Sequence, residues 1–339
     1  MRPQSQRNAV GRATFASTVS VMEPLDRHIR RRGLFLRRRD LLASGYTDDD
    51  IRAALELGVV FRVRQGWYSV PDAPSAAVRA VRVGGRLTGI SALESYGLRV
   101  PRRALAHIAV PINACRLRRP GDRQRRLVAD DPVRVHWILR QTRQSSVWRV
   151  SIDDALLVIL TEESRDIAVA CCSAVMRYKR WSARRLDAVF ARAPQHVQGW
   201  RPLVCALDDS HGETFARLWL TDAGIEWLSQ PHVAGVGRLD GRVGPHTYVE
   251  VDGGQHDPEW TGEEPGTYEK DHDRDTRMTI RGDRVLRFTY RQLYGHWAEV
   301  LAATKRAIAD DNALCAYRRR HPYRPSALPK TKDSRPKST

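Results

Sequence analysis

The nonapeptide YVEVDGGQH, residues 248–256, places two acids inside an apolar strand pattern. Val249 and Val251 suit a buried strand, yet Glu250 and Asp252 alternate with them. Because side chains alternate across a strand, the two acids point to the same face. Like charges beside a core are unfavourable unless they are paired or bound to a metal. The stretch therefore predicts a strand that carries a functional site.

The composition indicates which partner this site would meet. Lys and Arg number 57 against 39 Asp and Glu, which gives a formal charge of +18 and a pI of about 10.4. A charge of this size attracts polyanions at long range, so a nucleic acid is the expected partner. The chain has 339 residues, 42% of them hydrophobic, with nine Trp. This is enough for two or three domains with cores of their own.

Cysteine usage and hydropathy indicate the compartment. The cysteines form no C-x-x-C pair and have no His at metal-ligand spacing, so we expect buried, reduced thiols. No apolar run approaches the length of a membrane span, and the N-terminus lacks the apolar core of a signal peptide. We therefore expect a cytoplasmic protein. The cysteines are Cys115, Cys171, Cys172, Cys205 and Cys315.

The order of the sequence patterns predicts an α+β multi-domain protein. Polar, basic ends without periodicity predict a disordered arm, in which Met22 is an alternative start, and a disordered basic tail. The expected segments are the arm over 1–22, a winged helix over 23–72, a mixed α/β middle region over 73–207, a C-terminal domain with a mixed sheet over 208–315, and the tail over 316–339.

The first domain is predicted from three short helical patterns followed by a hairpin. Thr47 is a good N-cap with acids after it, and Gly58 ends the third helix. The hairpin alternates valines with Arg62 and Arg64 about a turn at Gln65-Gly66. Three helices and a basic wing follow one another in the order of a winged helix. The helices are expected over 23–31, 37–45 and 47–58, and the hairpin over 59–70.

Through LLASGYTDDDIRAALELGVVFRVRQGWYSV, residues 41–70, this domain resembles the N-terminal winged helix of AbiEi-type antitoxin regulators. The resemblance implies DNA binding, with residues 47–57 as the recognition helix. Asp48, Asp49 and Asp50 would repel phosphate at its tip, so nearby arginines have to outweigh them. A protein-docking or dimerisation module is the alternative. The arginines are Arg37, Arg38, Arg39, Arg62 and Arg64.

The middle region shows elements but no chemistry. We expect a capped helix over 84–98, then strands over 105–111 and 133–139 around an arginine-rich turn, then a helical run over 151–200. Ser151 and Ser182 are its predicted N-caps. A comparable segment follows the winged helix in AbiEi-like proteins.

The C-terminal domain contains three further patterns around the acidic strand. We expect a helix that bears Glu213, a strand that ends in Asp240, a helix over about 268–280 and a strand over 284–290. Acids at neighbouring strand ends can converge with a helix glutamate. Mg²⁺ or Mn²⁺ prefers such oxygen ligands, so Asp240 and Glu250 are the predicted metal ligands, and a metal-bound water would attack a phosphodiester.

These patterns, over about 208–310, resemble the PD-(D/E)XK nuclease superfamily, and most closely its branch similar to the very-short-patch-repair endonuclease. The resemblance implies a mixed sheet flanked by helices and metal-dependent cleavage of DNA. The superfamily's usual lysine would stand at Asp252. That lysine is also missing in the repair branch, where a histidine takes over, so His256 is the candidate for proton transfer. The implied catalytic residues are Asp240, Glu250, Asp252, His256 and Glu213.

Each candidate also has a structural interpretation. Glu213 follows Ser210 at capping-box spacing. Asp240 precedes a glycine, as in a hairpin turn. His256 alone suits a loop hydrogen bond. Asp273 and Arg277 form an i,i+4 pair on a solvated helix, although the resemblance implies that they position Asp252 or a phosphate. Arg287 suits contact with either phosphate or solvent.

Two functions follow from these patterns. The first is a metal-dependent deoxyribonuclease brought to DNA by the winged helix, in repair or in defence against phages and plasmids. The second is an AbiEi-like regulator or antitoxin whose nuclease-like domain is inactive. An RNA-directed nuclease stays open because the phosphate chemistry is shared, and so does a homodimer.

Overall fold

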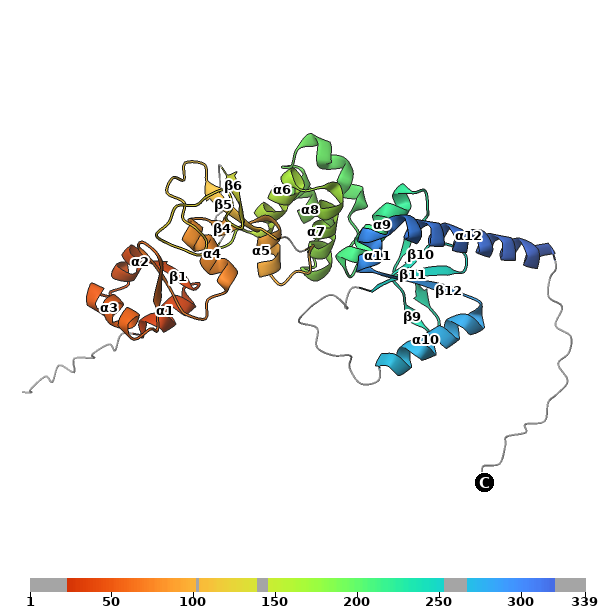
Figure 1. Cartoon of the computed structure of the whole chain (residues 1–339), viewed down its shortest axis with the longest axis horizontal. Helices are drawn as coiled ribbons and strands as arrows, with labels where there is room; N and C mark the ends of the chain where they lie inside the picture. The colour runs from red at the N-terminus through yellow and green to blue at the C-terminus, as the bar shows by residue number, and fades with distance from the viewer. Residues whose placement is uncertain (1–22, 102–103, 139–145, 253–266, 321–339) are drawn as a thin grey trace, which may run out of the picture. The chain divides into compact units, whose positions relative to one another are not determined.

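The computed structural model describes residues 23–101, 104–138, 146–252 and 267–320, with the side chains of 267–271 excepted. The predicted arm, most of the predicted tail and His256 lie outside these residues. The contacts divide the chain into two compact units, Met1–Val78 and Arg79–Thr339. The predicted middle and C-terminal regions thus lie in one unit. The described part contains both helices and several small sheets (Figure 1).

The first unit contains the three predicted helices and the hairpin, together with a short strand that was not predicted. Its elements are α1 (Leu25–Arg31), β1 (Phe35–Arg37), α2 (Arg38–Ala43), α3 (Asp48–Glu56), β2 (Phe61–Arg64) and β3 (Trp67–Ser69). β1 pairs with β3 and extends the hairpin to three strands. As predicted, Thr47 caps α3, and its side chain accepts the Asp50 backbone N–H at 3.2 Å. Buried apolar residues, among them Ile29, Phe35, Leu41, Ile51 and Val63, join helices to sheet.

The middle region starts the second unit. α4 (Ser75–Val83) crosses the boundary, and β4 (Arg86–Leu87), β5 (Ala106–Pro111) and β6 (Val133–Ile138) form a sheet in the order β4-β5-β6, with β5 and β6 parallel. The helix predicted over 84–98 is shorter than expected. α5 covers only Gly89–Ser95, because Arg86 and Leu87 pair with β5.

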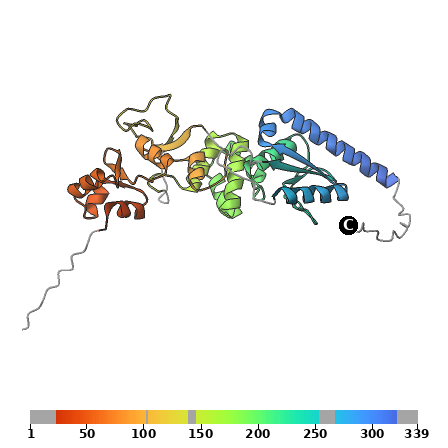
Figure 2. The ribbon, with the colours of Figure 1, turned by 60° about the horizontal axis from the view of Figure 1, so that its bottom comes forward.

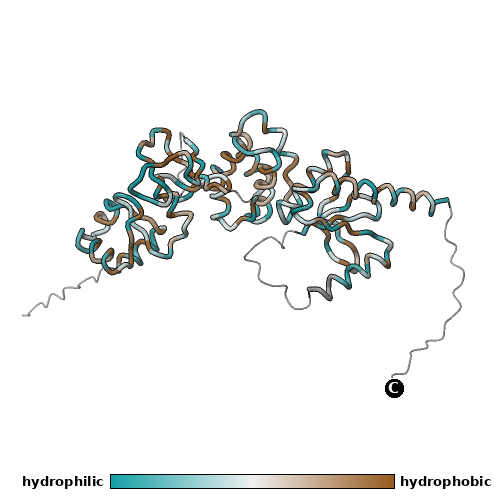
Figure 3. Tube along the Cα trace, viewed as in Figure 1, coloured by the Kyte–Doolittle hydropathy of each residue, from teal (hydrophilic) through white to brown (hydrophobic). Residues whose placement is uncertain are grey.

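The helical run is present as α6 (Ile152–Glu162), α7 (Arg165–Tyr178), α8 (Ala183–Phe190) and the 3₁₀ segment η1 (Gln195–Leu203). Ser151 and Ser182 cap α6 and α8 as predicted. Hydrophobic residues are dense along α6 and α7 (Figure 3). Cys171 and Cys172 are buried there, whereas Cys115 is exposed and Cys205 and Cys315 are half-buried, so the expectation of five buried thiols was wrong for three.

The C-terminal part is built on a sheet in the order β12-β11-β10-β7. β11 (Thr247–Asp252) is the predicted acidic strand; it runs parallel to β12 (Arg284–Thr289) and antiparallel to β10 (Gly241–Arg242). β7 (Leu228–Ser229) forms the other edge, and β8 (His232–Val233) pairs with β9 (Gly237–Arg238) in a separate hairpin. The helices are α9 (His211–Asp222), α10 (Thr267–Arg281), α11 (Tyr290–Gly295) and α12 (Trp297–Arg320).

Helices cover both faces of this sheet. α12 lies on one face and α10 on the opposite one (Figures 1 and 2). Val249 and Val251 point to the first face, into a core with α9, α11 and α12, and Tyr248 packs on the second with Met278 of α10. α12 continues through Arg320, so residues 316–320, expected in the disordered tail, are helical.

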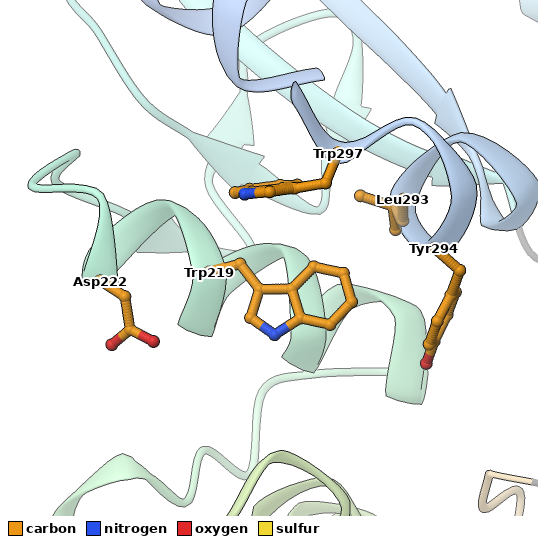
Figure 4. Close-up of a pocket in the computed structure, with 5 residues that line it drawn as sticks. All are labelled: Trp219, Asp222, Leu293, Tyr294 and Trp297. Atoms are coloured by element: carbon orange, nitrogen blue, oxygen red, sulfur yellow. The ribbon is translucent and has the colours of Figure 1, made fainter. Parts of the chain in front are cut away.

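Beside α9, a cavity of about 320 Å³ opens between aromatic side chains (Figure 4). The indole N–H of Trp219 donates to Asp166 of α7 at 2.7 Å, and Arg165 pairs with Asp222 at the end of α9. α9 therefore joins the middle helices to the C-terminal sheet. The cavity is lined by Trp219, Asp222, Leu293, Tyr294 and Trp297.

Candidate active site

Asp240 lies beside the acidic strand, as predicted, but not at the end of a strand. β9 ends at Arg238 and β10 begins at Gly241, so Asp240 stands between them. Gly241 pairs with Val249, and the antiparallel register therefore places Asp240 across from Glu250. One carboxylate oxygen of Asp240 accepts the backbone N–H of Val251 at 2.8 Å. This bond fixes the acid at the edge of β11.

Gly241, which follows Asp240, was interpreted from the sequence as part of a hairpin turn. In the structure it lies in β10 and packs against an aromatic ring. Gly241 is a strand residue, and a Cβ at this position would lie 2.2 Å from the ring of Trp227. Only glycine allows the strand to pass this ring at such a distance. The ring of Trp227 thus fixes the path of the chain immediately after Asp240.

Glu213 lies in the first turn of α9, and Ser210 caps this helix as predicted. The Ser210 hydroxyl accepts the Glu213 backbone N–H at 3.1 Å. The Glu213 carboxylate does not complete a capping box. It accepts the Asp209 N–H at 2.9 Å and the side-chain amide of Gln230 at 2.6 Å. The Gln230 backbone N–H in turn donates to the Asp240 carbonyl at 2.9 Å, which links Glu213 to the segment of Asp240.

The electrostatics of the two acids are unusual. Burial, and then repulsion from Asp240, raises the pKa of Glu213 to about 7. Burial also raises the pKa of Asp240 to about 6, and the charges of Glu250, Asp209 and Asp252 contribute, although the bond from Val251 opposes the rise. Both carboxyls thus hold protons closer to neutral pH than free acids do. The site has an excess of negative charge that these protons offset.

Glu250 is stabilised differently. Its Oε1 accepts from Arg274 of α10 at 2.8 Å, and its Oε2 accepts from Arg287 of β12 at 3.0 Å. Arg287 also binds Asp275 of α10 through both terminal nitrogens, at 3.0 and 2.5 Å. The carboxylate is 14% exposed, so these ion pairs provide the partners that a buried charge requires. Arginines therefore neutralise Glu250 in the described structure.

Arg274 was not predicted to contact the site, and Arg287 was predicted to reach phosphate or solvent. The parallel register sets Arg287 directly beside Glu250, and opposite charges at such positions attract. The two strand patterns predict that residues 250 and 287 lie on strands, whereas their register is set by tertiary pairing. The contact of Arg274 depends on how α10 packs, which the sequence does not specify.

The remaining predicted residues lie farther from this cluster. Asp252 is exposed at the end of β11, and its charge contributes to the raised pKa of Asp240. Asp273 is exposed on α10, and Arg277 donates to the Gly235 carbonyl at 2.5 Å, which holds the turn between β8 and β9. His256 is outside the described residues.

The donor chemistry of the site suits a hard divalent cation. Asp240, just before β10, and Glu250 of β11 lie across from each other, and each carboxylate has lone pairs beyond those used by its present partners. A cation there would offset the repulsion that raises the pKa of Asp240. Within the described ranges, however, no three His, Cys, Asp or Glu side chains gather as a ready-made metal cluster. The residues fit a metal bound through two acids and water.

In the first unit, the predicted DNA-contacting arginines have partners within the chain. Arg38 pairs with Asp48, and Arg39 lies 3.6 Å from Asp40. The guanidinium of Arg37 lies 4.8 Å from the Trp67 ring centroid, and that of Arg62 lies 5.7 Å from the Tyr68 centroid. Arg64 also has an interaction partner. The three aspartates of α3 are likewise engaged: Asp48 pairs with Arg38 and Asp49 with Arg52, and the Asp50 carboxylate accepts from the backbone N–H and the hydroxyl of Thr47.

No helix in the described part of the chain has both the length and the apolar character needed to span a membrane.

Comparison with known proteins gives little further information. No protein-family model matches the sequence, and no curated protein matches it. One solved structure that matches is the catalytic domain of the homing endonuclease I-Bth0305I, at 18% identity over 28% of this chain and 88% of that domain, with a TM-score of 0.22. A likeness this weak carries no argument about fold or function.

Proposed function

We propose that the C-terminal domain hydrolyses phosphodiester bonds in DNA with the help of Mg²⁺ or Mn²⁺. The observation that carries this proposal is the group of acids at the edge of β11. Glu213 is buried and Asp240 is half-buried, and both have raised pKa values. The charge of Asp240 acts on Glu213, and those of Glu250 and Asp252 act on Asp240. Acids with strongly perturbed pKa values are enriched at catalytic sites, and this pattern supports the nuclease resemblance of the sequence.

In the proposed mechanism, Asp240 and Glu250 hold the metal. When bound, the ion would supply a Lewis acid for the phosphate and a water of lowered pKa. Glu213, with a pKa of about 7, exchanges protons near neutral pH and suits a general base or acid. Asp252 adds negative charge at the open end of the strand, and His256 is the second candidate for proton transfer. Arg274 and Arg287 orient Glu250.

Plasmid nicking tests this proposal. Purified protein should convert supercoiled DNA to the open-circular form when Mg²⁺ or Mn²⁺ is added, and EDTA should stop the conversion. Asp240→Asn should lower the rate at least about 100-fold, because it removes a charged metal ligand. Asp187→Asn is the matched control, since Asp187 is exposed on α8, outside the acidic cluster, and makes a surface ion pair with Arg201. Nicking that survives in Asp240→Asn would refute the proposed role of this acid.

We further propose that the first unit is a winged helix that brings the chain to DNA. The order of its helices and strands and its resemblance to AbiEi-type regulators support this assignment. Asp48 currently neutralises Arg38 at the tip of α3. Asp48→Asn should therefore release Arg38 for phosphate and tighten DNA binding in low salt. Binding that weakens or stays unchanged would argue against α3 as the DNA-contacting helix.

A second candidate function is a DNA-binding regulator with an inactive nuclease-like domain. The observation that favours it is the double ion pair of Glu250, which leaves each carboxylate oxygen bound to an arginine. A structural network of this kind stabilises a fold without chemistry. Footprinting of the protein on its own promoter, together with no cleavage in Mg²⁺ or Mn²⁺, would establish this function.

A further inference from the structure

A second concentration of positive charge lies in the middle region. Residues 113–128, between β5 and β6, contain six arginines and one acid. We name this stretch the arginine loop. It contains no Phe, Trp, Tyr or His. The arginines are Arg116, Arg118, Arg119, Arg123, Arg125 and Arg126.

The arginine loop is an ordered hairpin. The Arg119 N–H donates to the Arg125 carbonyl at 3.1 Å, and the Leu127 N–H donates to the Leu117 carbonyl at 3.1 Å. Arg82 of α4 donates to the Pro120 carbonyl at 2.9 Å and holds the tip of the hairpin. A hairpin fixed in this way loses little conformational entropy when it binds a partner.

The acids in and beside the loop bind some of its arginines and stabilise the hairpin, while other arginines of the loop are exposed to solvent. Asp131, with a side chain 3% exposed, accepts from Arg119 at 2.8 Å and from the Val128 N–H at 2.9 Å. Asp122 lies 3.6 Å from Arg125. The remaining exposed arginines of the loop are Arg116, Arg123 and Arg126.

Two features show that this arrangement carries a conformational and an electrostatic penalty. Arg116 has a φ of 72°, in the left-handed region that disfavours residues with a Cβ. Arg123 lies close enough to Arg82 that its charge, after burial, contributes to a lowered pKa of the Arg82 guanidinium. Like charges held near one another by the hairpin and α4 are unfavourable in isolation, and a bound polyanion would relieve their repulsion.

The composition of the loop selects one kind of polyanion. Guanidinium groups bind phosphate oxygens in bidentate geometry. Proteins that hold single strands add aromatic side chains on which bases stack, and the arginine loop has none. A rigid turn with several guanidinium groups instead suits the regularly spaced phosphates of a duplex.

We propose that the arginine loop binds the phosphate backbone of duplex DNA through Arg116, Arg123 and Arg126. The surface rests on the proposed function, because it would hold the substrate of the C-terminal domain on the same compact unit. The contact is independent of sequence, since phosphates carry no base information.

The test measures binding of the full chain to a duplex DNA of random sequence in EDTA, over a series of salt concentrations. The variant combines Arg116→Asn, which suits the positive φ, with Arg123→Ser and Arg126→Ser. The plot of log K against log salt has a negative slope, and the loss of three phosphate contacts should reduce its magnitude by about 2.7, at about 0.9 per contact. Replacement of the same three arginines by lysine should keep most of the slope, because the charge stays.

A control variant removes the same charge elsewhere in the second unit. It combines Arg180→Asn, also at a positive φ of 51°, with Arg184→Ser and Lys305→Ser, all exposed. Thermal unfolding verifies that each variant is folded. The proposal is overturned if the control lowers the steepness of the salt dependence as much as the loop variant does, or if neither variant changes it. Because EDTA prevents metal-dependent cleavage, this experiment measures binding alone. If Asp240→Asn failed to abolish nicking, the proposed nuclease role would be refuted and the binding result would still stand.

Discussion

The raised pKa values of Glu213 and Asp240 predict that the fold is less stable in mildly alkaline than in mildly acidic solution. Both carboxyls bind protons more tightly in the folded chain than in the unfolded chain. The folded state therefore takes up protons between about pH 4 and pH 7, and stability falls as the pH rises through this window. Asp240→Asn removes one of the two charges and should reduce this dependence.

The magnitude follows from the change in pKa. For Asp240, the rise from 3.8 to about 6 corresponds to roughly 3 kcal/mol, at about 1.36 kcal/mol for each tenfold change in proton affinity. At pH 8, Asp240→Asn should therefore raise the free energy of unfolding by up to about 3 kcal/mol, whereas near pH 4 the change should be close to zero. In a domain of this size, the gain corresponds to a rise in Tm of roughly 6–12 °C. The amide oxygen can still accept the Val251 N–H.

Differential scanning fluorimetry at pH 5 and pH 8 measures this effect, with Asp187→Asn, which alters an exposed ion pair on α8, as control. At pH 8, Mg²⁺ or Mn²⁺ should raise the Tm of the unmodified chain, because a bound ion adds about 2.7 kcal/mol to the free energy of unfolding at a hundred times its dissociation constant. The ion should not raise the Tm of Asp240→Asn. A variant that melts below the unmodified chain at pH 8, or that keeps the same pH dependence, would refute the electrostatic argument.

Two further predictions concern packing and thiol chemistry. Gly241→Ala should destabilise the chain by about 1–3 kcal/mol, because the new Cβ would lie 2.2 Å from the Trp227 ring, whereas Gly295→Ala, with no atom within 4 Å, should be nearly neutral in urea unfolding. Equal midpoints would contradict this account. Cys115 is exposed and should react with a thiol reagent in the native protein, whereas Cys172, with a pKa raised to about 12 by burial, should react only after denaturation.

Local sequence patterns were sufficient for most helices and strands of the candidate site. The alternation in YVEVD predicted β11, and the caps at Thr47, Ser151, Ser182 and Ser210 marked helix starts correctly. These features depend on hydrogen bonds within a few residues, which a sequence specifies directly. Short strands such as β1 and β4 were missed, because only tertiary pairing makes them extended.

The partners of Glu250 could be predicted only in part. A metal was predicted to bind this acid, which stays a prediction, and the structure in addition brings Arg274 and Arg287 to it. Arg274 reaches Glu250 because α10 packs on the sheet, and Arg287 reaches it because β12 pairs with β11. Both are tertiary contacts, which no local sequence pattern specifies. The proximity of Glu213 to Asp240 was expected, and their raised pKa values depend on a burial that only the folded chain defines.

The attachment of α9 to α7 means that the C-terminal sheet and its helices depend on the middle region for part of their support. Asp166 holds the indole of Trp219, and Arg165 holds Asp222, on the same rigid helix whose first turn presents Glu213. A fragment that begins at residue 208 would lose both anchors and expose the aromatic side of this helix. The middle region therefore contributes to the support of the helix whose first turn presents Glu213.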